Sequence, residues 1–171
     1  MNTQDTISQT SIDAEYKKLE KEATQSGYFL NPDIDHTKAL IESLLINEKR
    51  YGYWACPCRL AEGEKQDDLD IICPCDYRDA DLTEFDTCFC GLYVGKDVYE
   101  GKKHIEAIPE RRPLKKDRLQ YKKEKSTSDS LSKTSQYPVW RCRVCGYLCA
   151  RDDPPGICPI CKAKKERFER F

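Results

Sequence analysis

Cysteine spacing constrains this chain more than any other feature. Three Cys-x-Cys pairs fall within 35 residues: Cys56-Pro57-Cys58, Cys73-Pro74-Cys75 and Cys88-Phe89-Cys90. A mononuclear site takes about four cysteine ligands, so six thiols exceed one such site. Four thiolates also hold an iron–sulfur cluster, and two further thiols that lie close together can cycle between disulfide and dithiol. We interpret the three pairs as one unit, with four thiols for a redox cluster and two for a disulfide beside it.

Composition limits the architecture and the class of partner. A chain of 171 residues allows one medium domain, or one domain with a small module, and its 35% charged residues favour a tail or linker within that length. The formal net charge of −1 argues against nucleic-acid binding. No apolar run approaches the roughly 18–20 residues that cross a bilayer, and residues 1–10 lack a signal-peptide pattern. We expect a cytoplasmic protein with no membrane partner, in which 11 cysteines indicate metal or redox chemistry.

Two helices are predicted before the first cysteine pair. The first carries Ile12, Tyr16, Leu19 and Ala23 along one face, with Thr10 or Ser11 as its cap and Gly27 as its stop. Asn31-Pro32 is expected to begin a second helix that reaches about Arg50. The second helix should turn these residues inward: Ile34, Ile41, Leu44 and Leu45.

Charge divides the remainder of the chain. Residues 62–86 hold ten acidic residues against Lys65 and Arg78, and we favour a solvated loop over a surface that steers a substrate protein. Residues 102–125 hold ten basic residues against four acidic ones. Leu92-Tyr93-Val94-Gly95 is either a short strand or the start of a turn. The predicted domains are a flexible N-terminus (1–10), a cluster domain (11–110), a basic and then Ser-rich linker (111–136) and a compact module (137–171).

The cysteine pairs and their flanking residues resemble the catalytic subunit of ferredoxin-thioredoxin reductase over roughly residues 12–110. The residues that carry the resemblance are Tyr51-Gly52-Tyr53, Cys56-Pro57-Cys58-Arg59, Cys73-Pro74-Cys75, Tyr77-Arg78-Asp79 and Cys88-x-Cys90. The resemblance implies that Cys56, Cys73, Cys75 and Cys88 ligate a [4Fe-4S] cluster. It also implies that Cys58 and Cys90 form the catalytic disulfide.

The same resemblance implies a reaction and its partners. Ferredoxin donates one electron at a time, whereas reduction of a thioredoxin-like protein disulfide needs two. Cys58 is assigned the attack on the substrate and Cys90 the association with the cluster, so Cys58 should be the more exposed thiol. The family usually has His between the third pair of cysteines, where this chain has Phe89, and His104 is a weak candidate to replace it.

The C-terminal module carries a second metal motif. Cys142-x2-Cys145-Gly146-Tyr147 and Cys158-Pro159-x-Cys161 have the spacing of two knuckles that hold one metal tetrahedrally. Trp140, Tyr147 and Phe168 should form its small aromatic core. The stretch resembles rubredoxin, in the short form joined to rubrerythrins, which implies one iron and one-electron transfer. A zinc ribbon is the alternative, and Cys149 is left over.

We therefore expect a mainly α, irregular helical cluster-binding domain with a small β-rich, rubredoxin-like module. The leading function is a ferredoxin-dependent disulfide reductase. Its alternatives are an electron-transfer protein without reductase activity and a zinc-binding interaction protein. An acidic ferredoxin needs a basic dock, for which the candidates are Lys102, Lys103, Arg111, Arg112, Lys115 and Lys116. Association as a homodimer stays open.

Overall fold

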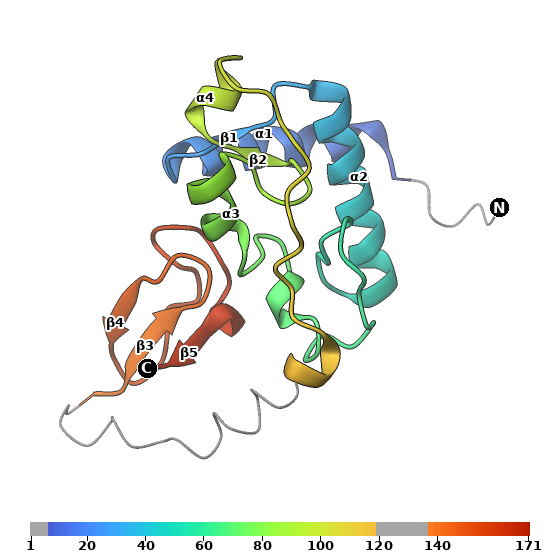
Figure 1. Ribbon diagram of the computed structural model, residues 1–171. Helices are drawn as coiled ribbons and strands as arrows, with labels where there is room; N and C mark the ends of the chain where they lie inside the picture. Colours follow the sequence, from blue (N-terminus) through green and yellow to red (C-terminus); the bar gives the residue numbers. More distant parts are fainter. Residues whose placement is uncertain (1–6, 119–136) are drawn as a thin grey trace. The chain divides into compact units, whose positions relative to one another are not determined.

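The computed structural model describes residues 7–118 and 137–171. The chain divides between Pro109 and Glu110 into two compact units (Figure 1). The first unit is helical and irregular with one small sheet, and the second is built on a three-stranded sheet. This confirms the predicted fold class. The Ser-rich part of the predicted linker, 126–136, lies outside the described residues.

The first helix starts earlier in the sequence than predicted. α1 spans Gln9–Gln25, and the Ser8 hydroxyl caps it by accepting from the backbone N–H of Ser11 at 3.2 Å. The prediction of Thr10 or Ser11 as the cap was wrong because Ser8 supplies the hydroxyl one turn ahead. The helix ends before Gly27, whose φ of 81° suits a glycine.

The second helix is capped by Asp33 and not by Asn31. α2 spans Ile34–Tyr51, and Asp33 Oδ1 accepts from the backbone N–H of His36 at 3.0 Å. Both polar atoms of the Asn31 side chain are used ahead of the helix, because Oδ1 accepts from the backbone N–H of Asp33 at 2.9 Å and the amide nitrogen donates to the carbonyl of Gly91 at 2.9 Å. The prediction that Ile34 faces inward was also wrong, since Ile34 is 52% exposed in the first turn.

A two-stranded sheet joins the helices to the third cysteine pair. β1 (Phe29–Leu30) pairs antiparallel with β2 (Tyr93–Val94), with Leu30 opposite Tyr93. The residues 92–95, which the sequence left between strand and turn, therefore include a strand. Three short helices complete this unit: η1 (Leu69–Ile71), α3 (Arg78–Phe85) and α4 (Lys96–Tyr99).

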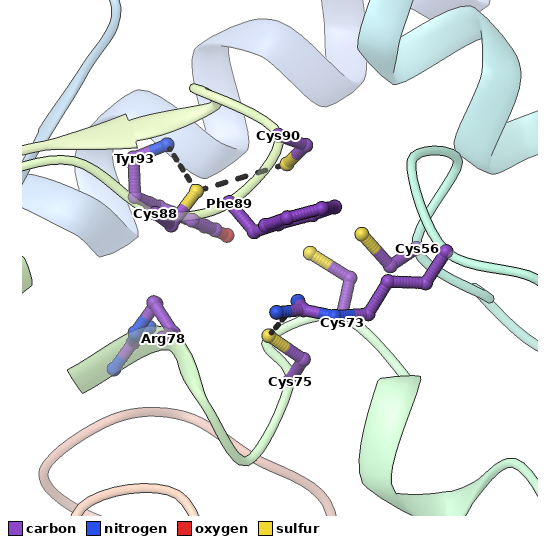
Figure 2. A pocket seen from close by; sticks show the side chains of 9 residues that line it. Cys56, Cys73, Cys75, Arg78, Cys88, Phe89, Cys90 and Tyr93 are labelled. Carbon is purple, nitrogen blue, oxygen red and sulfur yellow. Dashed lines mark hydrogen bonds between the residues drawn. The ribbon is translucent and has the colours of Figure 1, made fainter. Parts of the chain in front are cut away.

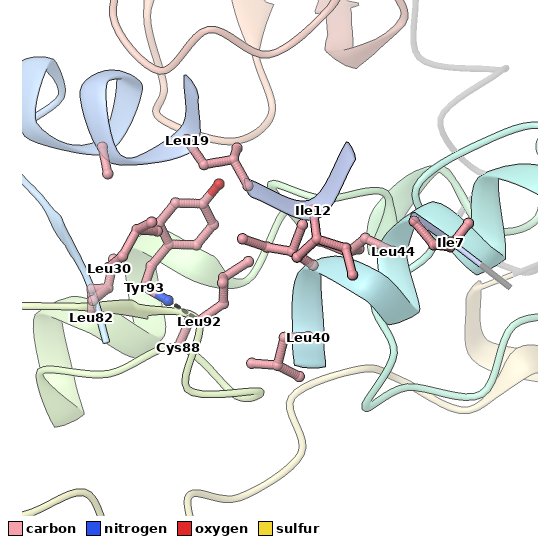
Figure 3. Packing of buried hydrophobic residues seen from close by; sticks show 12 residues of the cluster. Ile7, Ile12, Leu19, Leu30, Leu40, Leu44, Leu82, Cys88, Leu92 and Tyr93 are labelled. Atoms are coloured by element: carbon pink, nitrogen blue, oxygen red, sulfur yellow. Dashed lines mark hydrogen bonds between the residues drawn. The ribbon is translucent and has the colours of Figure 1, made fainter. Parts of the chain in front are cut away.

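The main core lies between the helices and this sheet. Figure 3 shows side chains from α1 and α2 packed together with Leu92 and Tyr93. Ile41 and Leu44 of α2 are fully buried, and burial of each such side chain contributes about 1.5–3 kcal/mol. Cys88 belongs to the same cluster of buried residues, so the core supports the third cysteine pair directly.

The second unit is a small sheet with an aromatic core. Its strands are β3 (Val139–Cys142), β4 (Leu148–Ala150) and β5 (Phe168–Arg170), in the order β4-β3-β5 and all antiparallel, with η2 (Lys165–Arg167) leading into β5. Phe168 is buried, and Trp140 and Tyr147 pack against its cluster, as predicted. Over 7–118 and 137–171, no helix has the length and apolar character to cross a membrane.

Candidate redox and metal sites

The first two cysteine pairs are brought together by a short antiparallel contact. Ala55 and Ile72 form an isolated bridge. The backbone N–H of Cys56 donates to the carbonyl of Ile71 at 2.9 Å, and that of Cys73 donates to the carbonyl of Trp54 at 2.8 Å. These bonds fix two loops that are separate in sequence, so that their thiols enter one site.

The third pair is held by the small sheet. The backbone N–H of Cys88 donates to the carbonyl of Tyr93 at 2.9 Å. The backbone N–H of Tyr93 donates in return to Cys88 Sγ at 3.3 Å. Gly91 turns the chain at a φ of 73°. The position of the Cys88 sulfur is thus defined by backbone groups on both sides of the turn.

Five of the six cysteines line one cavity, which we call the cysteine cavity. Its lining residues are Cys56, Cys73, Cys75, Cys88, Cys90, Arg59, Arg78, Phe89 and Tyr93. Figure 2 shows Cys88, Phe89 and Cys90 on the loop that leads into β2, with Cys56, Cys73 and Cys75 on the segments that face it. The structure therefore brings the four cysteines predicted as ligands into one place, together with Cys90.

Cys58 lies at the edge of this arrangement. It is exposed, whereas Cys90 is half-buried and Cys90 Sγ lies 3.7 Å from Cys88 Sγ. The Cys90 thiol shares hydrogen bonds with Cys56, Cys58 and Cys88, and these raise the pKa of Cys90 well above its usual value.

The thiols differ in their ionisation. The hydrogen bond with Cys90 lowers the pKa of Cys58 to about 7, and the positive charge of Arg59 acts in the same direction. Burial instead raises the pKa of Cys75 to about 12 and that of Cys73 well above its usual value. Thiolates at Cys73 and Cys75 therefore need compensating positive charge, which iron would supply. This donor set fits a cluster held by thiolates.

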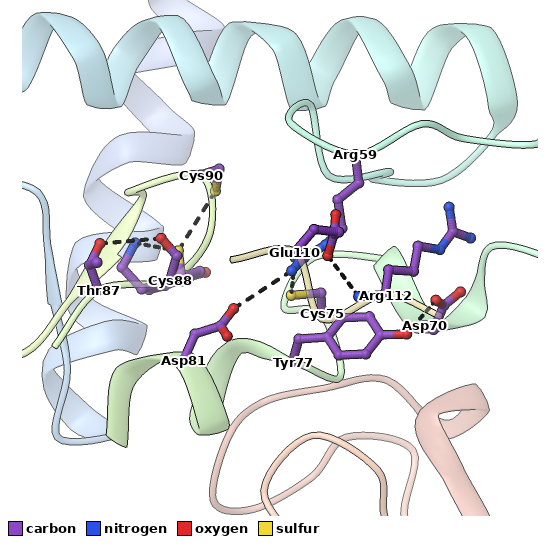
Figure 4. Close-up of polar contacts among 11 residues, drawn as sticks. Arg59, Asp70, Cys75, Tyr77, Asp81, Thr87, Cys88, Cys90, Glu110 and Arg112 are labelled. Carbon is purple, nitrogen blue, oxygen red and sulfur yellow. Dashed lines mark hydrogen bonds and ion pairs between the residues drawn. The ribbon is translucent and has the colours of Figure 1, made fainter. Parts of the chain in front are cut away.

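Several acids that surround the first cysteine pair are buried. Asp68 accepts from the Tyr53 hydroxyl at 2.7 Å and from the backbone N–H of Glu62 at 2.7 Å. Figure 4 shows Asp81 paired with Arg59, their closest atoms being 3.6 Å apart, and both side chains are at most 1% exposed. The preference for a solvated loop over 62–86 was wrong for these residues, because Asp68 and Asp81 are buried against polar partners and Asp81 lies in α3.

A histidine missed by sequence reasoning contacts the loop that carries Cys88 and Cys90. His36, in the first turn of α2, places Nε2 3.3 Å from the carbonyl oxygen of Cys90. His104 lies on the exposed segment after α4 and is not among the residues that line the cysteine cavity. No local sequence pattern marks His36, because its partner Cys90 lies 54 positions away along the chain.

The C-terminal module gathers its four predicted ligands into one site. The sulfurs of Cys142, Cys145, Cys158 and Cys161 all lie within 4.8 Å of one another. Cys142 Sγ is 3.6 Å from Cys161 Sγ, and Cys145 Sγ is 3.6 Å from Cys158 Sγ. A tetrahedron with metal–sulfur bonds of about 2.3 Å separates its sulfurs by about 3.8 Å. The site therefore has the dimensions of a four-cysteine metal centre.

Two similar turns build this centre. The backbone N–H of Cys142 donates to the carbonyl of Tyr147, and that of Cys158 donates to the carbonyl of Ala163, both at 2.8 Å. Gly146 and Lys162 turn the two loops at positive φ, 75° and 61°. A hydrogen bond with Cys161 lowers the pKa of Cys142 to about 5, so one ligand is readily deprotonated. Cys149 lies outside this group of four.

The basic candidates for a ferredoxin dock are spread over both units. Lys102 and Lys103 belong to the first unit, and the other four cations belong to the second. Lys102 pairs with Glu100, and Lys103 donates to the carbonyl of Phe85 at 3.0 Å. The dock stays a prediction.

Comparisons with known protein families cover both parts of the chain. Residues 5–121, more than half of the chain, match the family model described as ferredoxin thioredoxin reductase catalytic beta chain. Residues 140–169 match the rubrerythrin, rubredoxin-like domain. A search of curated proteins found no match. The paired cysteines and the match over residues 5–121 agree, and the chain belongs to the ferredoxin thioredoxin reductase catalytic beta chain family, with a rubredoxin-like domain at residues 140–169.

Proposed function

We propose that this chain is a ferredoxin-dependent disulfide reductase that acts on thioredoxin-like protein disulfides. The observation that supports it most is the difference in position between Cys58 and Cys90, the two thiols that are not predicted as ligands. Cys90 lines the cysteine cavity beside the predicted ligands, whereas Cys58 is exposed. A reductase needs one thiol that a protein substrate can reach and a second that stays beside the electron source.

In this proposal Cys56, Cys73, Cys75 and Cys88 hold a [4Fe-4S] cluster. These thiols come from three segments whose backbones are tied together by hydrogen bonds, so the ligand positions are set by the fold. When bound, the cluster supplies electrons one at a time to a reaction that consumes two. Arg59 and Arg78 line the same cavity and offset the negative charge of the four thiolates.

The exchange itself is carried by Cys58 and Cys90. The Cys58 thiolate attacks one sulfur of the substrate disulfide, a bond forms between Cys58 and that sulfur, and the other substrate sulfur leaves and takes a proton. Cys90 then loses its proton and attacks Cys58 Sγ, which releases the second substrate thiol and forms the Cys58–Cys90 disulfide. The substrate has gained two electrons and two protons. Two electrons from ferredoxin and two protons from solvent restore the dithiol.

The ionisation of the thiols supports these roles. The thiolate is the nucleophile, and a pKa of about 7 makes Cys58 substantially ionised near neutral pH. Cys90 holds its proton more tightly, because its hydrogen bonds to three neighbouring sulfurs raise its pKa. Cys58 is therefore the first to attack.

For the C-terminal centre we propose one iron that takes part in one-electron transfer. Four thiolates suit iron and zinc alike, and the match to a rubredoxin-like domain favours iron. A cytoplasmic location is proposed with it, since a reducing compartment keeps so many thiols available.

The proposal is tested by anaerobic reduction of a thioredoxin disulfide with reduced ferredoxin, measured as thiols released. The wild-type chain should release thiols in proportion to the ferredoxin oxidised, and Cys58→Ser should abolish the reaction. Cys149→Ser is the matched control, because Cys149 lies outside both sites, and its rate should equal that of wild type. Equal rates for Cys58→Ser and wild type would reject the reductase and leave electron transfer.

A further inference from the structure

Arg59 is a buried cation in direct contact with a cysteine predicted as a ligand. Its residue exposure is 6%, and Nη1 donates to Cys75 Sγ at 3.3 Å. Nη2 lies 3.6 Å from Oδ2 of the buried Asp81. A buried charge is costly unless it is paired and hydrogen-bonded. The hydrogen bond to Cys75 and the ion pair with Asp81 offset the cost of burying this guanidinium beside the sulfur.

Two aromatic rings keep Arg59 in place. The guanidinium carbon lies 4.4 Å from the centre of the Phe89 ring and 4.8 Å from that of the Tyr77 ring. The Tyr77 hydroxyl donates to Asp70 at 2.8 Å, which anchors that ring. Cation–π contacts are stronger when the cation is desolvated, as Arg59 is here. Phe89 is thus a packing partner of Arg59.

Arg78, the second arginine of the cavity, is held differently. It makes an ion pair of 2.8 Å with Asp79, and its guanidinium lies over the rings of Tyr28 and Tyr93. Arg59 has the longer contact with its carboxylate and a hydrogen bond to a sulfur. Arg59 is therefore better placed to act on a group bound by the cysteines.

We propose that Arg59 and Phe89 act as a pair that raises the reduction potential of the cluster bound in the cysteine cavity. This inference rests on the proposed function. Addition of one electron makes the bound group more negative by one charge, and ferredoxin or dithionite supplies that electron. A positive charge and a hydrogen bond at Cys75 Sγ stabilise the reduced form more than the oxidised form. Phe89 contributes through Arg59, by fixing the guanidinium, and is a positioning residue.

The test is the midpoint potential of the loaded full-length protein, followed by absorption during an anaerobic redox titration. Arg59→Met should shift the potential to more negative values. Phe89→Leu should give a smaller shift of the same sign. Phe89→Tyr keeps an aromatic ring over Arg59 and should have the wild-type potential. In the Arg59→Met background, Phe89→Leu should add nothing, because its effect passes through Arg59. That last comparison separates positioning from a general structural role.

Two control substitutions remove a similar cation or a similar ring outside the cysteine cavity. Lys38→Met removes a cation that lies over Tyr16, and Phe29→Leu removes a ring stacked on Tyr99; both belong to contacts outside the cavity lining and should leave the potential unchanged. If Arg59→Met does not fold, Arg59→Lys keeps the charge but loses the planar fork, and a smaller negative shift is expected. An unchanged potential in whichever of these two variants is measured would overturn the inference.

Failure of this inference is distinguishable from failure of the proposed function. Iron and acid-labile sulfide are measured on every sample. If the wild-type protein contains no acid-labile sulfide, both the proposed function and this inference are rejected. If the wild-type protein contains the cluster and reduces disulfides, but the variants have an unchanged midpoint potential, only this inference is rejected.

Discussion

His36 Nε2 lies 3.3 Å from the carbonyl oxygen of Cys90, although the two residues are 54 positions apart in the sequence. Because a carbonyl oxygen only accepts, the imidazole must donate from Nε2. The contact ties the first turn of α2 to the loop that carries Cys88 and Cys90. The positions of the loop thiols therefore depend on a helix that precedes all of the cysteines.

Loss of this contact should loosen the loop. His36→Ala removes a hydrogen bond that contributes about 1 kcal/mol, so amide hydrogen exchange near Cys90–Leu92 should accelerate by about five-fold. The measurement is exchange followed by mass spectrometry. His104→Ala is the control and should leave these amides unchanged. Equal protection in His36→Ala and wild type would show that the contact does not restrain the loop.

Cys90→Ser should trap the substrate. Cys58 still attacks, but no second thiol is available to resolve the mixed disulfide, so a covalent complex should accumulate with an oxidised thioredoxin-like protein. Non-reducing electrophoresis and peptide mapping should place the bond at Cys58. Cys58→Ser should form no such complex, and Cys149→Ser should behave as wild type. A bond mapped to Cys90 in the wild-type chain would reverse the assigned roles.

The pH dependence of alkylation should separate the two thiols. The pKa of Cys58 is lowered from 9.0 to about 7, so its thiolate fraction rises as the pH passes through 7 and is nearly complete by about pH 8. Iodoacetamide modification of Cys58 in the dithiol form should follow that curve. Cys90, whose pKa is raised, should stay slow over the same range. A Cys58 curve centred near 9 would show that its neighbours do not activate it.

Leu60 should contact the protein substrate. It is 90% exposed and two residues from the exposed Cys58. Leu60→Ser should raise KM for a thioredoxin-like disulfide by about five-fold, equivalent to about 1 kcal/mol, and leave reduction of a small aromatic disulfide unchanged. Leu114→Ser changes a 65% exposed leucine in the other unit and should have no effect. An equal loss of activity with both substrates would show that Leu60→Ser disturbs the thiol site and not the docking of the protein substrate.

Removal of the C-terminal metal should unfold its own unit. The module has a small core in which the four ligands are among the packed residues, so its folding should depend on the metal. In Cys142→Ser/Cys145→Ser, limited proteolysis should cleave residues 137–171 rapidly and spare residues 7–109. Cys149→Ser should resist proteolysis like wild type. Equal resistance in the double variant would show that the sheet is stable without the centre.

The cysteine spacing was enough to predict both sites as groups of residues. Local pattern predicted the convergence of Cys142, Cys145, Cys158 and Cys161, because each knuckle is a turn whose bonds lie within a few residues. It also predicted that α1 and α2 precede the first pair. These features are determined by neighbours in sequence.

Tertiary contacts decided what the sequence did not predict. Asn31 has the side chain of a helix cap but bonds Gly91 instead, and Asp33 takes its place. Asp68 and Asp81 lie in an acidic stretch yet are buried, because Tyr53 and Arg59 are their partners. The sequence shows only that Phe89 stands where the family usually has His. The structure shows that the Phe89 ring packs on the Arg59 guanidinium. Such pairings depend on residues far apart along the chain.

In the function proposed for this chain, four cysteines of the three Cys-x-Cys pairs hold an iron–sulfur cluster, and the other two form a dithiol beside it. Iron, zinc and acid-labile sulfide per chain, with the absorption spectrum of anaerobically prepared protein, test it most directly. We expect about four sulfides and about five irons per chain, from one [4Fe-4S] cluster and one mononuclear iron. Cys73→Ser should lose the sulfide, whereas Cys149→Ser should keep it. A colourless protein with stoichiometric zinc and no sulfide would contradict it.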